Sequence, residues 1–177
     1  MDSTVQKRIA VLIFGPMGTG KSEISTKLAE REGFVYINPD SFWDRSTGVE
    51  FEREKGDKNF SKAYGEMIYC IQRGKSFLLD SALKRKIDRQ EVITILRDMN
   101  RFVPEYNFKI IGCYVNSSLD KCLQRNRSRT GSQPEETIKK YHQFFEIEVP
   151  NKSEGFDTFY KIENDKDVIP DLSFIKF

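Results

Sequence analysis

The residues of this chain whose types and spacing could carry chemistry begin with the stretch Gly15–Ser22. It reads Gly-Pro-Met-Gly-Thr-Gly-Lys-Ser and matches the pattern G-x-x-x-x-G-K-[ST]. In this pattern the glycines let successive backbone N–H groups point at one anion, and the N-terminus of a helix faces the same point. Lys21 can then reach the β- and γ-phosphates of a nucleotide, and the hydroxyl of Ser22 can bind Mg²⁺. The residues expected to contact the nucleotide are Gly15, Met17, Gly18, Thr19, Gly20, Lys21, Ser22 and Thr26.

The sequence on either side of this stretch supports the prediction. Arg8–Phe14 is almost entirely apolar and predicts a buried strand, whereas Lys21–Glu32 has the pattern of a helix. A glycine-rich turn without a ligand is the alternative, but the pattern has its functional meaning in a strand–loop–helix context. We therefore expect ATP as the bound nucleotide, together with Mg²⁺.

Two aspartates each follow or end a predicted strand. Asp40 comes just after the strand predicted at Phe34–Ile37, where a carboxylate could orient an attacking hydroxyl and accept its proton. Its alternative role is the N-cap of a short helix. Asp80 ends the strand predicted at Ser76–Asp80, where it could hold Mg²⁺ or contact the substrate, or simply form part of a turn.

A third group of candidates lies on a basic helix predicted at Leu119–Arg127. Arg125 and Arg129 fall on one stripe of this segment with Lys121. Arginine donors suit the charge that builds on a transferring phosphoryl group. A solvated basic face is the alternative. Because the helix is followed by a glycine turn, we expect the segment at about 117–135 to form a lid over the nucleotide.

Apolar runs alternate along the chain with segments of helical period, which predicts a three-layer α/β/α fold with a five-stranded parallel sheet. The remaining elements are expected at Phe60–Arg73, Arg89–Phe102, Phe108–Val115, Pro134–Glu146 and Phe159–Ile162. No repeat or linker interrupts the pattern, so residues 1–177 form one predicted domain with an arginine-bearing lid. Ligands of such sheets bind at the carboxyl ends of the strands, so Gly15–Ser22, Asp40 and Asp80 should share one rim.

The composition sets limits on the class of protein. The 177 residues are 38% hydrophobic and 32% charged, with a net charge of +2. This near-neutral balance supplies no global attraction to nucleic acid. The chain has no apolar run of the ~18–20 residues that a membrane span requires. Cys70, Cys113 and Cys122 are widely spaced within apolar patterns, so we expect small buried hydrophobic residues in a reducing, cytoplasmic compartment.

A local basic run follows Asp80 on the predicted rim. It comprises Lys84-Arg85-Lys86 and Arg89, and it would suit a nucleic-acid backbone. The alternative is a solvated helix start. We count Arg85 and Arg89 as candidate substrate contacts, together with Asp40 and Asp80.

These motifs together resemble the polynucleotide-kinase-like branch of small phosphate-loop kinases, a group related to the zeta-toxin-like phosphotransferases. The most distinctive part is R-N-x-x-R at Arg125–Arg129 followed by P-E-x-x-I at Pro134–Ile138. Gly15–Ser22, Ile37–Asp40 and Leu79–Ser81 also match, and so do Val149-Pro150 and Glu154–Asp157. The resemblance implies transfer of the ATP γ-phosphate to a hydroxyl. It implies that Lys21 and Ser22 serve the phosphates and Mg²⁺, that Asp40 is the general base, and that Arg125 and Arg129 close over the nucleotide; the catalytic residues would be Lys21, Asp40 and Arg125.

The acceptor half departs from the family pattern. Trp43 stands where polynucleotide kinases often have an arginine for a substrate phosphate; Arg45 could substitute, and Trp43 could stack on a base or sugar ring. Our leading hypothesis is a kinase for the 5′-hydroxyl of RNA or DNA. A small-molecule kinase for a nucleoside, nucleotide, sugar or antibiotic is the second, and a regulatory NTPase without an acceptor is the third.

Overall fold

The computed structural model describes residues 8–42, 53–102, 104, 107–166 and 168–177. Its centre is a five-stranded sheet in the order β2-β3-β1-β4-β5, in which every neighbouring pair is parallel. The strands are β1 (Arg8–Phe14), β2 (Val35–Ile37), β3 (Phe77–Asp80), β4 (Phe108–Asn116) and β5 (Thr158–Glu163). The prediction of a five-stranded parallel sheet is confirmed.

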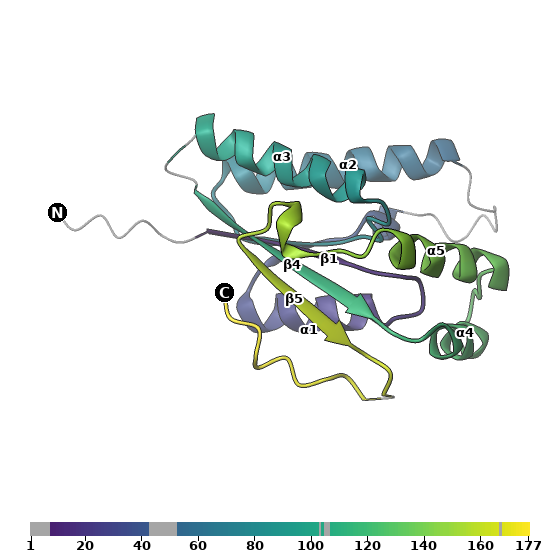
Figure 1. Ribbon diagram of the computed structural model, residues 1–177. Helices are drawn as coiled ribbons and strands as arrows, with labels where there is room; N and C mark the ends of the chain where they lie inside the picture. The colour runs from purple at the N-terminus through teal and green to yellow at the C-terminus, as the bar shows by residue number, and fades with distance from the viewer. Residues whose placement is uncertain (1–7, 43–52, 103, 105–106, 167) are drawn as a thin grey trace.

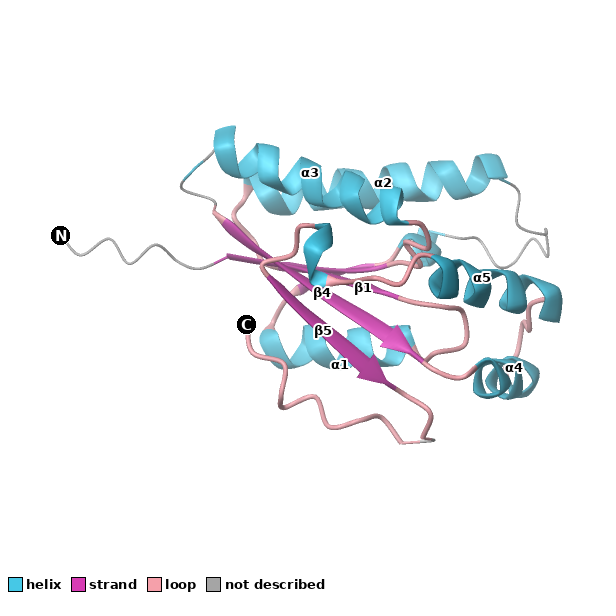
Figure 2. Ribbon diagram, in the orientation of Figure 1, coloured by secondary structure: helices cyan, strands magenta, loops and turns pink. Residues whose placement is uncertain are grey.

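Helices cover both faces of this sheet, which gives the three layers expected (Figures 1 and 2). One face carries α2 (Arg53–Gln72) and α3 (Lys86–Phe102), and the other carries α1 (Lys21–Glu32). Helices α4 (Leu119–Ser128) and α5 (Glu135–Ile147) lie together beyond the ends of β1 and β4, where the arrowheads point.

Side chains along β1 alternate between the two faces of the sheet, so this one strand contributes to two hydrophobic clusters. Ala10, Leu12 and Phe14 join the cluster under α2 and α3, whereas Ile9, Val11 and Ile13 join the cluster against α1. A strand buried on both sides must be apolar throughout, as this one is. The order of the strands contains a switch point between β3 and β1. The connection that leaves β1 leads to β2 on one side of the sheet, whereas the connection that leaves β3 leads to β4 on the other side. In open α/β sheets, ligands bind beyond the carboxyl ends of the strands at such a point.

Several predicted boundaries were wrong at helix starts. Helix α2 begins at Arg53 rather than Phe60, and α3 begins at Lys86 rather than Arg89. Asp88 is therefore inside α3, where its carboxylate accepts from the backbone N–H of Arg85 at 3.1 Å. Helix α5 begins at Glu135, close to the expected Pro134, and Glu135 pairs with Arg127 at 2.6 Å.

The cysteines and the lengths of the helices agree with the composition. Cys70, Cys113 and Cys122 are free and buried, as expected of small hydrophobic residues. Among the described residues, none of the helices combines the length and apolar character needed to cross a bilayer.

Candidate active site

The loop Gly15–Ser22 leaves β1 and enters α1, as the motif requires. Gly15 and Gly18 have φ values of +149° and +83°. A Cβ atom would lie 2.0 Å from the carbonyl oxygen of Val115 at Gly15 and 2.7 Å from that of Cys122 at Gly18. Both positions therefore need glycine for conformation and for space. The loop is packed tightly between α1, the end of β4 and α4.

Lys21 sits at the centre of the site. Its Nζ donates to the carbonyl oxygen of Pro16 at 2.8 Å, which curls the side chain back over the loop. Burial lowers the pKa of Lys21, whereas the carboxylates of Asp80 and Asp40 raise it. Arg129 is near enough to lower the same pKa. Both predicted carboxylates and Arg129 of the predicted lid therefore lie within electrostatic reach of one ammonium group.

Asp80 is buried at the carboxyl end of β3, where it is 3% exposed. Its Oδ2 accepts from the phenol of Tyr36 at 2.8 Å and from Asn38 Nδ2 at 3.3 Å. Burial raises the pKa of this carboxyl group, while Lys21, Tyr36 and the hydroxyl of Ser22 lower it through charge and hydrogen bonds. The phenol of Tyr36 in turn has its pKa raised to about 12 by burial and by Asp80, so it remains a donor at neutral pH.

The contact between Ser22 and Asp80 bears on the expected Mg²⁺ site. It places a hydroxyl oxygen beside a carboxylate oxygen at the mouth of the phosphate loop. Mg²⁺ prefers oxygen ligands and usually keeps several waters and phosphate oxygens, so two protein ligands of this kind fit the ion. Ser22 and Asp80 are thus the residues that would hold it.

Asp40 lies on the short 3-10 helix η1 (Pro39–Phe42) directly after β2. The cap of this turn is Asn38, whose Oδ1 accepts from the backbone N–H of Asp40 at 2.8 Å. The alternative of an N-cap aspartate is therefore not what the structure contains. The carboxylate of Asp40 is exposed, and it is electrostatically close to Lys21 and to Tyr141 on α5. It is free to meet an acceptor from solvent.

The lid segment packs directly on the phosphate loop through α4. Met17 packs on the small cluster formed by Cys122, Leu123 and Ile138. Arg125 reaches back so that its Nη1 lies 3.4 Å from the carbonyl oxygen of Gly18, and its Nη2 donates to that of Lys166 at 2.6 Å. The basic stripe of α4 therefore faces the nucleotide loop at Arg125.

Other predicted contacts have different positions. Thr26 is exposed on α1 and donates to the carbonyl oxygen of Ser22 at 2.8 Å. Thr19 is buried and donates to that of Pro16 at 2.9 Å, so its side chain shapes the loop. Trp43 and Arg45 lie outside the described residues.

The prediction that Arg89 contacts substrate is wrong. The guanidinium is 0% exposed and forms a two-pronged ion pair with Glu154, with Nε–Oε2 2.6 Å and Nη2–Oε1 2.8 Å. Sequence position placed Arg89 at a solvated helix start, but α3 begins one turn earlier, so Arg89 points into the core. Arg85 is exposed, and its Nη2 pairs with Asp88 at 2.5 Å. The basic run is thus partly neutralised.

Sequence reasoning missed three residues that shape the site. Tyr36 and Asn38 hold Asp80, and their spacing of two residues, which puts both on one face of the strand and its extension, was the available signal. Asn164, just after β5, is buried and donates from Nδ2 to the carbonyl oxygen of Thr19 at 2.7 Å. Nothing in the local sequence marks Asn164, because its partner is 145 residues away.

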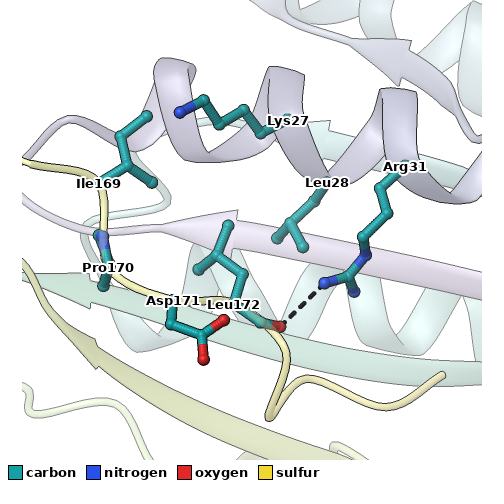
Figure 3. Close-up of a pocket in the computed structure, with 7 residues that line it drawn as sticks. All are labelled: Lys27, Leu28, Arg31, Ile169, Pro170, Asp171 and Leu172. Carbon is teal, nitrogen blue, oxygen red and sulfur yellow. Dashed lines mark hydrogen bonds between the residues drawn. The ribbon is translucent and has the colours of Figure 1, made fainter.

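A cavity of about 270 Å³ lies elsewhere, between α1 and the C-terminal segment (Figure 3). Arg31 crosses one side of it and donates to the carbonyl oxygen of Leu172 at 2.9 Å. The other lining residues are Lys27, Leu28, Ile169, Pro170 and Asp171, so none of the predicted site residues faces this cavity. The converging groups, and not the cavity, mark the candidate active site.

Comparison with known proteins gives one family match and a set of similar folds. A family model described as "AAA domain" matches residues 11–147, which is well over half of the chain. A cytidylate kinase from Solibacter usitatus (strain Ellin6076) is 55% identical over 38 residues, and that match covers 22% of this chain and 16% of the kinase.

Solved structures with a similar fold include kinases that are named for different substrates. The Pnkp1/Rnl/Hen1 RNA repair complex matches with a TM-score of 0.62 at 16% identity, covering 98% of this chain and 53% of that one. A deoxyadenosine kinase from M. mycoides matches with a TM-score of 0.57 at 18% identity, covering 90% and 93% of the two chains. A gluconokinase from Sinorhizobium meliloti 1021 matches with a TM-score of 0.57 at 15% identity, covering 90% and 86%. These likenesses establish the fold.

Proposed function

We propose that this chain, which belongs to the AAA-domain family, transfers the γ-phosphate of ATP to a hydroxyl group. The observation that carries the proposal is the convergence on Lys21, which lies close to Asp80, Asp40 and Arg129 at once. A protein that only senses a nucleotide has less use for an exposed carboxylate opposite the phosphate loop. Such a carboxylate suits an acceptor hydroxyl whose proton must be removed.

Each residue then has a distinct role in the transfer. The backbone N–H groups of Gly15–Ser22 and the ammonium of Lys21 bind the phosphates, and Ser22 with Asp80 would hold Mg²⁺, which would supply positive charge to the phosphates. Asp40 orients the acceptor hydroxyl and accepts its proton as the oxygen attacks the γ-phosphorus. Arg125 on α4 and Arg129 directly after it neutralise the charge that spreads over the oxygens of the transferring phosphoryl group.

For the acceptor, we favour a compact hydroxyl compound over a polynucleotide. The support is the state of the basic run: Arg89 is buried against Glu154 and Arg85 is paired with Asp88. A backbone groove for nucleic acid needs several free cations in a row. The second candidate, the 5′-hydroxyl of RNA or DNA, is supported by the R-N-x-x-R and P-E-x-x-I motifs at Arg125–Arg129 and Pro134–Ile138.

Transfer of labelled phosphate from ATP tests both candidates. The purified protein would be incubated with labelled ATP, Mg²⁺ and either 5′-hydroxyl oligonucleotides or a metabolite extract, with products identified by mass spectrometry. We expect labelled small molecules. Labelled oligonucleotides alone would establish the second candidate.

Two variants separate transfer from simple hydrolysis. Lys21→Ala should abolish transfer and weaken ATP binding, whereas Asp40→Asn should abolish transfer and leave ATP binding nearly intact. ATP hydrolysis that is unaffected by Asp40→Asn, with no labelled product, would instead identify a regulatory NTPase.

A further inference from the structure

Lys84 lies on the acceptor side of the site, in the loop that follows Asp80. Its Nζ lies 4.6 Å from the ring centroid of Tyr141 and 5.0 Å from that of Phe144, both on α5. An ammonium group that lies over two aromatic rings is held there by electrostatic attraction to the ring electrons. Among the described residues, no carboxylate oxygen lies within ion-pair distance of Lys84. Its N–H groups that point away from the rings are therefore available to a ligand.

The backbone at Lys84 is held rigidly by Arg89. All five guanidinium N–H groups of Arg89 are used, because Nη1 also donates to the carbonyl oxygens of Leu83 at 3.0 Å and Lys84 at 3.3 Å, and Nη2 to that of Glu148 at 3.2 Å. Leu83 has a φ of +39°, the one positive value among non-glycine residues described. A conformation of this kind persists where the surroundings enforce it, and such sites cluster around ligands.

In the described loop after Asp80, the ammonium of Lys84 has no carboxylate partner, whereas Arg85 pairs with Asp88. Asp88 raises its pKa, and Arg85 and Lys140 lower it, while burial lowers it most. The carboxylate of Asp88 is already engaged by Arg85. On the other side, burial and then the charge of Asp40 raise the pKa of the Tyr141 phenol, so Tyr141 is near the proposed base. The ring of Tyr141 therefore contacts Lys84, and its phenol lies within electrostatic reach of Asp40.

We propose that Lys84 is an anion-binding residue of the acceptor site, and that the acceptor carries a phosphate or carboxylate group besides the hydroxyl that is phosphorylated. The identification of the ligand as an acceptor rests on the proposed function. The binding of an anion at Lys84 does not depend on that function. A single preorganised ammonium beside the base matches one anionic group on a compact substrate, and it orients the hydroxyl toward Asp40.

The first experiment measures binding without turnover. The full chain, saturated with Mg²⁺ and a non-hydrolysable ATP analogue to fill the phosphate loop, would be labelled with ¹³C at the lysine ε-carbons. The Lys84 signal is assigned by its absence in Lys84→Met. Titration with inorganic phosphate and, separately, with gluconate as a carboxylate probe should shift this signal. The signal of Lys75, assigned in the same way with Lys75→Met, is the matched control. Lys75 also lies over a tyrosine ring, 5.8 Å from the centroid of Tyr69, but at the opposite end of β3.

The second experiment compares acceptors in pairs that differ by one anionic group: a nucleoside against its 3′-monophosphate, and glucose against gluconate. Lys84→Met should lower kcat/KM for the anionic member about 10- to 100-fold, as the loss of a hydrogen bond to a charged group does, and leave the neutral member unchanged. Methionine keeps the length and apolar contacts of the side chain, so the fold should survive.

The outcomes separate the two proposals. A Lys84 signal that neither probe moves, or equal losses for both members of each pair, overturns the anion site and leaves the kinase assignment standing. A shift of the signal in a protein that phosphorylates no acceptor supports the anion site and removes the proposed function. The more effective probe of the two distinguishes a phosphate from a carboxylate.

Discussion

The ion pair between Arg89 and Glu154 offers a sharp test of how the acceptor loop is held. Both side chains are fully buried, at 0% and 1% exposure, and 65 residues separate them in sequence. Removing either partner leaves a charge in the core without its counter-charge, which costs about 3–5 kcal/mol. We therefore expect Arg89→Met and Glu154→Leu each to lower the free energy of unfolding by about that amount.

The double variant should recover most of this loss. Replacing both charges with apolar residues of similar volume is often neutral. What remains is the lost partner of the Leu83 carbonyl oxygen, which is a buried acceptor and costs about 1–3 kcal/mol when unsatisfied. The carbonyl oxygens of Lys84 and Glu148 are only part-buried, so water can replace the guanidinium there.

Urea unfolding of the four proteins, followed by far-UV circular dichroism, measures this cycle. We expect the double variant to be more stable than either single variant, with a coupling of at least about 3 kcal/mol. The exposed pair between Arg127 and Glu135 is the control, and its variants should change stability far less, because solvent screens the two charges. Additive losses at Arg89 and Glu154, or single losses as small as those of the exposed pair, would refute the reasoning.

Three further predictions concern the active site. Tyr36→Phe removes a hydrogen bond that lowers the pKa of Asp80, so the acid limb of the pH–rate profile should move to higher pH; an unmoved limb would mean that Asp80 does not control it. Burial raises the folded-state pKa of Asp80 above its ordinary value of 3.8, so the folded protein loses stability as pH rises through the folded-state pKa. Asp80→Asn should remove this loss, and we expect a higher melting temperature near neutral pH together with reduced transfer. Arg125→Ala should lower kcat by ~10³ or more, and the same rate in Arg125→Ala as in an Arg127→Ala control would place Arg125 outside the reaction.

Short-range patterns predicted much of the fold. Continuous apolar runs predicted β1 and β4, and the glycines of the loop predicted where β1 ends and α1 begins. Helix starts were less predictable: α2 begins seven residues before the expected Phe60, because the polar residues ahead of it carry no strong helical signal. The early start of α3 also turned Arg89 from an expected surface cation into a core residue.

What the sequence by itself determined is the position of the phosphate loop and of the two carboxylates. The loop Gly15–Ser22, Asp40 and Asp80 are each positioned by the strand that precedes them, and parallel strands bring their carboxyl ends to one rim. What only the tertiary structure decided is which charges remain free to act. Arg89 is neutralised by Glu154, while Lys84 is seated on Tyr141 and Phe144. These partners lie tens of residues away, and the pairing of buried charges depends on distance in space rather than on spacing along the chain.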